Sequence, residues 1–332
     1  MILALILILV SLVVSIFLIW KGSDWITDSL IPLAHKLGTS YIAIMTLLVS
    51  MLLSLPELFI TIYSYFLGYL DIGLGVILGS VIINIGLTVG LSAAVKPLQV
   101  EKSIVIRDGI FLIIIAIVVM LFGSDLKYQR SEGLILLLLF IPYVLNVWAF
   151  EKWRPQKSKT EKVKRIKENL SLISHIPFLE FKPSVLTFVL GSVMLVFGSY
   201  LFSVSLIKLS GVLPIPELFI GIVFGALGTV APNLAAAIQG TLKGYKDAAV
   251  SETFGSNIFT LLVTLGILII LQPFTIVGKL FYFDLTWMII LHLLMVGFIF
   301  KGYRYREESL TRFEGMVLVI FYLVIVLVNI FW

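Results

Sequence analysis

Polar side chains interrupt two long apolar stretches in the first third of the chain. Glu57 follows Ser54 and Pro56 in the first stretch, and Asn84 follows Ser80 by four residues in the second, so the last two share a helix face. A carboxylate inside a membrane costs roughly 2.5 to 3.5 kcal/mol, so Glu57 needs a function or a partner. Pro56 frees a backbone carbonyl. These oxygens suit a hard cation such as Na⁺ or Ca²⁺.

A second set of polar residues occupies equivalent places further along the chain. A shift of 176 residues aligns residues 22–97 with a later segment without a gap, and about twenty of the 76 aligned positions are identical. The shift places Glu57 on Asn233 and Asn84 on Thr260. The two halves are therefore copies of one unit. The polar positions of the second copy are Thr229, Asn233, Ser256 and Thr260.

The composition places the chain in a lipid bilayer. Its 332 residues are 60% hydrophobic with a mean hydropathy of +1.12, whereas soluble domains are roughly 45 to 50% apolar. The formal net charge of +5 comes mainly from one hydrophilic segment, which argues against nucleic-acid binding. Cysteine is absent, which excludes disulfides, thiolate metal sites and a cysteine nucleophile.

Apolar runs of about 20 residues predict the membrane-spanning helices. The expected fold class is an all-α integral membrane protein with ten transmembrane helices in two inverted five-helix repeats. The first run lacks a basic residue before Lys21 and a cleavage pattern, so it is interpreted as a helix rather than a signal peptide. The helices are expected near residues 3–21 (extending toward 35), 41–67, 72–95, 104–123, 132–150, 184–209, 215–241, 247–271, 281–300 and 314–331.

The domain organisation follows from the repeat. Residues 1–150 form the first five-helix repeat, with its polar motifs within about 41–95, and 184–332 form the second, with its motifs within about 215–271. A basic linker, 151–183, joins them. Because five is odd, the second copy enters the membrane from the opposite side, which is the plan of secondary transporters.

The distribution of basic residues predicts the orientation. With both termini outside, the inner loops collect 19 Lys and Arg residues and the outer loops four. This asymmetry follows the positive-inside rule and places the linker 151–183 in the cytoplasm. A multi-pass protein of the plasma or inner membrane is expected, and a monomer is compatible with the sequence, which does not fix the oligomeric state.

Four motifs at consistent spacing resemble the two alpha repeats of the sodium/calcium exchanger family of cation antiporters. They are SLPEL at 54–58, GSVIINI at 79–85, GTVAPNL at 228–234 and GSNIF at 255–259. The resemblance implies four central helices around the ions, alternating access by sliding of the first and sixth helices, and a transporter rather than an enzyme. The implied ion ligands are Ser54, Glu57, Ser80, Asn84, Thr229, Asn233, Ser256 and Thr260.

Departures from the family pattern reduce the charge of the site. The usual motif is Gly-Thr-Ser-x-Pro-Glu in both repeats, but Val230 stands for Ser and Asn233 for Glu in the second, and Thr260 stands where Asp or Asn is common. Only Glu57 keeps a carboxylate. Glu252, one turn before Ser256, is a secondary candidate for an ion ligand that compensates for the lost carboxylates. Alternatively, it is a residue near the membrane surface within reach of Lys246.

Other intramembrane polar residues are interpreted as structural. Asp108 and Asp284 are expected at helix starts, where the positive end of the helix favours a carboxylate. Lys21 and Asp24 are expected to pair, and His292 to be packed inside the bundle.

The sequence therefore predicts an antiporter that exchanges a divalent cation, with Ca²⁺ favoured, for Na⁺ or H⁺, without a cofactor. Its partners are inorganic cations and the lipid bilayer. One alternative is an exchanger of monovalent cations or protons; another is an ion-binding sensor of the same fold that does not transport. A membrane-embedded enzyme is disfavoured, because no known catalytic motif pairs a nucleophile with a base.

Overall fold

The computed structural model describes residues 2–36, 50–152, 184–242, 244, 248–305 and 309–331. From residue 153 onward, the predicted linker 151–183 lies outside the described residues, and so does Lys246, the expected neighbour of Glu252. The described chain is almost entirely helical, which confirms the all-α class. Short loops connect the helices, and the two strands are two residues long each.

Each half of the chain contains a similar series of helical segments. The first half contains α1 (Ile2–Lys36), α3 (Leu55–Phe66), α4 (Leu70–Ile83), η1 (Asn84–Val89), α5 (Gly90–Val95), α6 (Lys102–Ile104), η2 (Val105–Gly109), α7 (Ile110–Phe122), η3 (Gly123–Asp125), β1 (Lys127–Tyr128) and α8 (Arg130–Lys152). The second contains α10 (Val185–Val212), α11 (Glu217–Ile220), η4 (Gly221–Gly225), α12 (Ala226–Leu242), α13 (Ala248–Phe259), η5 (Thr260–Thr264), α14 (Leu265–Leu271), β2 (Phe274–Thr275), η6 (Leu280–Leu285), α15 (Thr286–Tyr305) and α16 (Arg312–Phe331).

The described residues contain eight helices that are long and apolar enough to cross a membrane, or nine if one bent pair counts as a single span. The bent pair joins Glu217–Ala231 to Asn233–Leu242 at an angle of 54°. The expected count of ten is therefore not confirmed. The predicted span 41–67 is described only from residue 50 onward.

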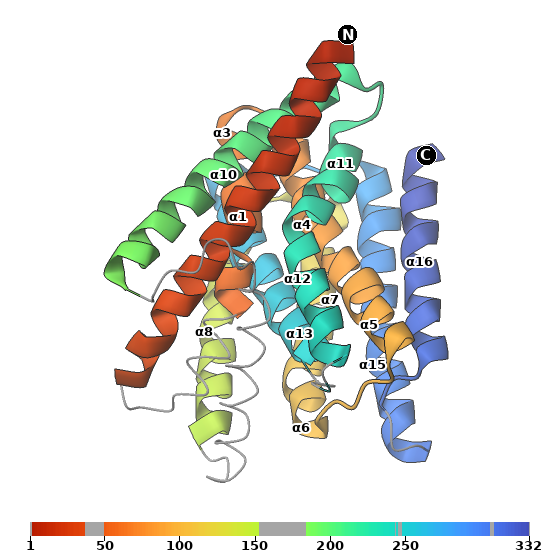
Figure 1. Cartoon of the computed structure of the whole chain (residues 1–332). Helices are drawn as coiled ribbons and strands as arrows, with labels where there is room; N and C mark the ends of the chain where they lie inside the picture. The colour runs from red at the N-terminus through yellow and green to blue at the C-terminus, as the bar shows by residue number, and fades with distance from the viewer. Residues whose placement is uncertain are drawn as a thin grey trace.

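The helices form a tilted outer pair against a compact bundle. In Figure 1, α1 and α10 lie side by side along the front of the molecule, and Gly22 of α1 allows their backbones to approach closely. Within the bundle, α4 packs against α12, α5 against α16, and α8 against α14. Both chain ends lie at the upper end of the bundle, whereas α6 and the last turns of α15 lie at the lower end.

Contacts between the halves occur in repeat-related pairs. The residue pair Tyr128 and Phe274 joins β1 to β2, and its repeat-related counterpart, which also joins the two halves, is the isolated bridge between Leu98 and Leu310. Helix contacts follow the same rule. A Cβ on Gly133 would lie 2.7 Å from Gly266 O, and one on Gly315 would lie 2.6 Å from Gly90 O.

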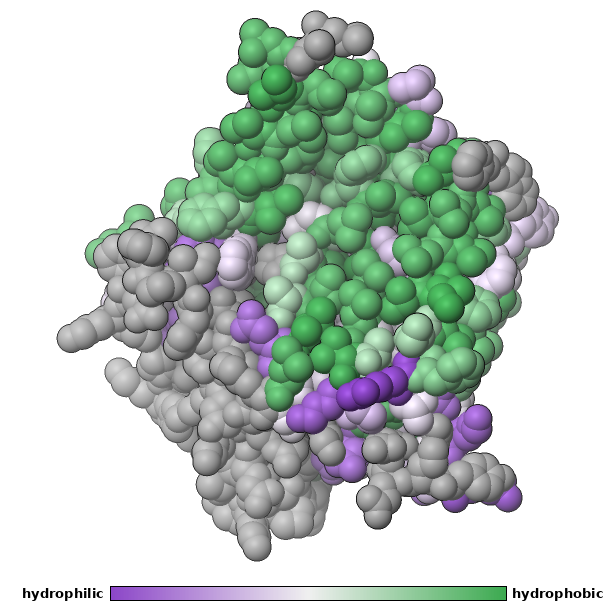
Figure 2. Space-filling model, turned by 45° about the vertical axis from the view of Figure 1, so that its right-hand side comes forward, coloured by the Kyte–Doolittle hydropathy of each residue, from purple (hydrophilic) through white to green (hydrophobic). Residues whose placement is uncertain are grey.

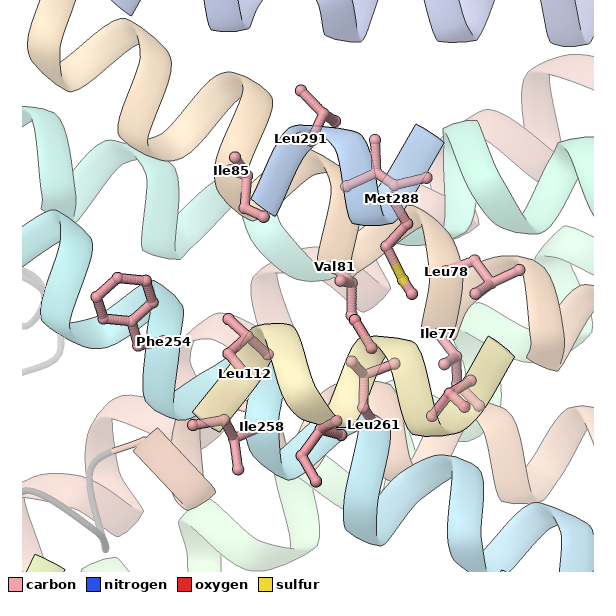
Figure 3. Close-up of a cluster of buried hydrophobic side chains, with 14 of the residues drawn as sticks. Ile77, Leu78, Val81, Ile85, Leu112, Phe254, Ile258, Leu261, Met288 and Leu291 are labelled. Atoms are coloured by element: carbon pink, nitrogen blue, oxygen red, sulfur yellow. The ribbon is translucent and has the colours of Figure 1, made fainter. Parts of the chain in front are cut away.

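A cluster of apolar side chains fills the bundle interior. It includes residues of α4 and α13, which also carry buried polar side chains. Figure 3 shows apolar side chains from several helices in one cluster, among them Val81 of α4, Leu112 of α7, Ile258 of α13 and Met288 of α15. Because lipid is as apolar as these side chains, their van der Waals packing, rather than escape from water, holds the helices together. Close packing also fixes the rotation of α4 and α13 about their axes.

The outer surface matches a lipid environment. Figure 2 shows hydrophobic residues over most of the visible face and hydrophilic residues near its lower end. Large apolar side chains such as Leu3, Val185 and Phe313 are exposed on the helices. A bilayer is the environment that covers such a surface without cost.

Two buried aspartates differ from the expected placement at helix starts. Asp108 lies in η2, inside the continuous helix that begins with α6, and its carboxylate accepts hydrogen bonds from Arg107 at 2.7 and 2.6 Å. Asp284 lies in η6 and accepts one from Asn329 at 2.9 Å. Both are thus held by side chains rather than by a helix terminus.

Lys21 and Asp24 pair as expected, with 3.5 Å between the ammonium nitrogen and a carboxylate oxygen. His292 is fully buried, and its Nδ1 lies 2.6 Å from Met288 O. Both observations confirm the structural interpretation of these residues.

Candidate cation site

A break in the helix positions Glu57. Residues 50–53 are helical, Ser54 forms a turn, and α3 starts again with Pro56 in its first turn. Since proline has no N–H, the carbonyl of Leu52 cannot receive its usual helical hydrogen bond. Glu57 itself is 0% exposed, and neither of its carboxylate oxygens has a hydrogen-bond partner among the described residues. A buried carboxylate in this state needs a cation or a proton.

Thr229 of α12 approaches this carboxylate from the second half of the chain. Its hydroxyl donates to Ala226 O at 3.1 Å, and in this orientation its oxygen lone pairs are available to a cation beside Glu57. The bend at Pro232, the repeat equivalent of Pro56, lies one turn further along. Both halves thus place oxygen atoms beside an interrupted helix.

Three of the predicted residues form a direct hydrogen-bonded chain between the halves. Ser54 Oγ donates to Ser50 O at 3.0 Å and lies 2.8 Å from Ser256 Oγ, so Ser256 is the donor of that second bond. Asn84 Nδ2 donates to Ser256 Oγ at 3.4 Å. The chain links the break before α3 with α13 and η1.

Asn257 is a residue that the sequence analysis did not select. Its Oδ1 accepts from Asn84 Nδ2 at 2.9 Å, and its own Nδ2 donates to Val81 O at 3.1 Å. These bonds turn the amide nitrogen of Asn84 toward α13 and leave the Asn84 side-chain oxygen for a cation. The signal was present, because Asn257 follows Ser256 in the GSNIF motif.

Two π-helical turns begin at equivalent positions of the repeats. One starts at Asn84 and the other at Thr260, 176 residues later. The wider turn disrupts the regular backbone hydrogen bonds, and such turns are frequent at functional sites. The Thr260 hydroxyl is buried without a partner among the described residues, so it too has unused hydrogen-bonding capacity.

The remaining candidates differ in how closely they join this group. Ser80 is buried and donates to Ile77 O at 3.0 Å, and Asn233 is buried on α12 one turn after Thr229. Glu252 is half-buried, and no hydrogen bond links it to the other candidates in the described part of the chain.

The site therefore has little negative charge. In the part of the chain that the structure describes, no three His, Asp or Glu side chains gather into a metal-binding group. One carboxylate, that of Glu57, stands among hydroxyl, amide and carbonyl oxygens. Such a set can bind a hard cation, with the attraction strengthened by the low dielectric of the interior.

The protein is a multi-pass helical bundle with related halves, and buried oxygen atoms lie where its interrupted helices meet. This combination is typical of a membrane transporter of small ions. A family model described as sodium/calcium exchanger protein matches residues 7–149 and 183–331. The chain belongs to this family, whose members are exchangers and not enzymes. The resemblance noted in the four motifs is thereby confirmed.

One relative extends over almost the whole chain. The sodium/calcium exchanger MaX1 of Methanosarcina acetivorans is 27% identical over 352 residues, which cover 96% of this chain and 97% of the relative.

Two solved structures share the fold. That of the sodium-calcium exchanger NCX_Mj has a TM-score of 0.65 at 22% identity and covers 96% of this chain and 97% of its own. That of the H⁺/Ca²⁺ exchanger CAX has a TM-score of 0.70 at 14% identity and covers 98% and 86%.

Proposed function

We propose that this protein exchanges Ca²⁺ for Na⁺ or H⁺ across the membrane and that Glu57 is the one charged ligand that the exchanged ions share. The carboxylate of Glu57, fully buried without a partner among the described residues, is the observation that carries the proposal. The names of the relative MaX1 and of the two solved exchangers support Ca²⁺ as one of the ions.

Competition for one carboxylate accounts for obligatory exchange. When neither ion is bound, Glu57 is a buried charge whose passage through the membrane interior is unfavourable. A bound cation or a proton removes that penalty, so the loaded site crosses and the empty site does not. The neutral oxygens of the shell come from the helix breaks and π-helical turns: Ser54, Ser80, Asn84, Thr229, Asn233, Ser256 and Thr260.

A second candidate is an exchanger of monovalent cations or protons. The specific observation in its favour is Asn233, which leaves one carboxylate where the family motif has two. One negative charge neutralises Na⁺ or H⁺ fully but Ca²⁺ only in part. The substitution Asn233→Glu separates the candidates. It tightens Ca²⁺ binding if Ca²⁺ is transported, and otherwise traps cations or stops the cycle, because the extra buried charge stays unneutralised.

Flux measurements in reconstituted vesicles test the proposal. Proteoliposomes with the wild-type chain should take up Ca²⁺ when a Na⁺ gradient or a pH gradient is imposed, and the effective gradient identifies the coupling ion. Empty liposomes and the Glu57→Gln variant are the controls. Ca²⁺ uptake that ignores both gradients would refute antiport, and no Ca²⁺ flux with gradient-driven Na⁺ or H⁺ movement would favour the second candidate.

We also infer that the lower end of the bundle in Figure 1 faces the cytoplasm. That end carries α6 and the last turns of α15, with Lys102, Lys301 and Arg304. Positive charge is retained on the cytoplasmic side of membranes. A cysteine introduced at Lys159 should react only from the cytoplasm, and one at Asp125 only from outside. Labelling of both from the same side would contradict this orientation.

A further inference from the structure

A groove opens between α1 and α10 near the end of the bundle where the N-terminus lies. Its volume is about 440 Å³. The groove ends at a pair of serines, Ser11 and Ser205, whose hydroxyl oxygens lie 2.7 Å apart. Its walls combine apolar and small residues with a single cation: Leu7, Ile8, Ser11, Ser205, Lys208, Gly211 and Val212.

Lys208 is the charged residue of this groove. It belongs to a membrane-spanning helix, four residues before the helix ends at Val212. No carboxylate of the described residues forms an ion pair with it. A lysine at this depth extends its ammonium group toward the headgroup layer, where phosphate groups are the available anions. The groove therefore has an uncompensated positive charge beside lipid.

The surface that continues from the groove is suited to acyl chains. Phe197 lies about three helical turns before Lys208 on the same face of α10, and Val14 lies two turns after Leu7 on the same face of α1. Both side chains are exposed. At the mouth, Leu7 is 61% exposed. A lipid with its phosphate near Lys208 would cover these apolar residues as its chains run toward the membrane centre.

We propose that this groove binds one anionic phospholipid, with its phosphate on the ammonium group of Lys208 and its glycerol portion in the space beside Gly211. The serine pair limits the depth of entry. Ser205 Oγ donates to Leu201 O at 2.7 Å, so Ser11 donates to Ser205 and the two hydroxyls offer acceptor oxygens, not donors, to the lipid. A lipid with a net negative charge is favoured, because a zwitterionic lipid already carries a cation of its own.

Two variants alter the groove in different ways. Lys208→Gln removes the charge. Gly211→Leu fills the space, and it does so without strain, since no atom lies within 4 Å of a Cβ at this glycine. Matched controls exist outside the groove. Lys127→Gln removes an exposed lysine predicted to lie at the same membrane side, and Gly297→Leu adds the same side chain at another exposed glycine with equally open surroundings.

Native mass spectrometry of the purified full-length chain tests the proposal, with phosphatidylglycerol and phosphatidylcholine of the same acyl chains as probes. The wild type should bind one phosphatidylglycerol about five-fold more tightly than phosphatidylcholine, the ratio that corresponds to roughly 1 kcal/mol for one lysine near an anionic lipid surface. Lys208→Gln should lose this preference, and Gly211→Leu should bind neither lipid at this stoichiometry. Both controls should match the wild type.

Equal binding of phosphatidylglycerol by the wild type and Lys208→Gln would overturn the proposal. So would an equal loss in Lys127→Gln, because it would indicate unspecific attraction to basic residues. Retained binding in Gly211→Leu would place the lipid elsewhere on the protein. None of these outcomes depends on transport, so the test is independent of the exchanged ion.

Discussion

The two halves of the molecule differ most where they meet at the candidate site. Ser54 before α3 is joined to Ser256 by a hydrogen bond of 2.8 Å. The repeat-related pair is Val230 and Ser80, in which valine has no hydroxyl, and Ser80 donates instead to Ile77 O at 3.0 Å. Glu57 likewise corresponds to Asn233. The first half therefore supplies the charge and the hydrogen bond that the second half lacks.

The backbone framework around these residues is nevertheless alike in both halves. The π-helical turns start 176 residues apart. A Cβ on Gly79 would lie 2.7 Å from the Cβ of Ala226. In the repeat-related contact, a Cβ on Gly255 would lie 2.7 Å from the Cβ of Ser50, which is equivalent to Ala226. Helix packing is therefore maintained in both copies, while the ligands differ. A duplicated framework thus carries one charged site.

The largest expected effect follows from removing that charge. Glu57→Gln keeps the size of the side chain but cannot neutralise a cation, so transport should fall to background while the protein still folds. Ion flux into proteoliposomes measures the first outcome and thermal unfolding in detergent the second. Glu252→Gln is the matched control and should retain most of the flux. Normal flux in Glu57→Gln would contradict the assignment of Glu57 and indicate Glu252 as the charged ion ligand.

A stability difference is expected between the two repeat-related aspartates. Asp108→Asn removes the charge partner of buried Arg107 and should cost about 3 kcal/mol of unfolding free energy. Asp284→Asn replaces an acceptor whose partner is the neutral amide of Asn329, so its cost should stay below about 1 kcal/mol. Thermal unfolding of both variants under the same conditions measures the difference. A larger loss of unfolding free energy for Asp284→Asn than for Asp108→Asn would contradict the inference that the ion pair of Asp108 contributes more to stability.

Equal effects are expected at the repeat-related glycines. Gly133→Val and Gly315→Val each force a side chain into a facing backbone, and each should destabilise the protein by about 1 to 3 kcal/mol. Gly297→Val, in open surroundings, should leave the unfolding temperature unchanged. If only one of the paired variants is destabilised, helix packing differs between the halves as the ligands do.

The sequence predicted much of this fold because its patterns are local. The helices expected at 132–150 and 314–331 correspond to α8 and α16, and the motifs around Glu57 indicated the family. The assignment of the ion ligands stays a prediction. The π-helical turns at Asn84 and Thr260 were not predicted, because tertiary packing rather than composition sets them.

Asn257 was missed for a related reason. Regular α-helical spacing places Asn257 about 100° away from its neighbour Ser256, which suggests a different face of α13. In the bundle, α4 lies against one of these faces and the break before α3 against the other, so Asn257 reaches Val81 O while Ser256 reaches Ser54. Contacts between helices that are distant in sequence cannot be derived from spacing along one of them.

The smallest effect is expected from restoring one missing hydroxyl. Val230→Thr keeps the volume of a fully buried side chain and adds an oxygen at the position equivalent to Ser54. A neutral hydrogen bond contributes about 0.5 to 1.5 kcal/mol, so the apparent affinity for the transported cation should rise about two- to ten-fold if the hydroxyl reaches Ser80 or the ion.

Val230→Ala, which changes volume without adding an oxygen, is the control and should not tighten binding. Cation titrations of flux measure both variants. Equal affinity in Val230→Thr and wild type, with unchanged thermal stability, would show that the second half has lost its ligand geometry along with its ligands.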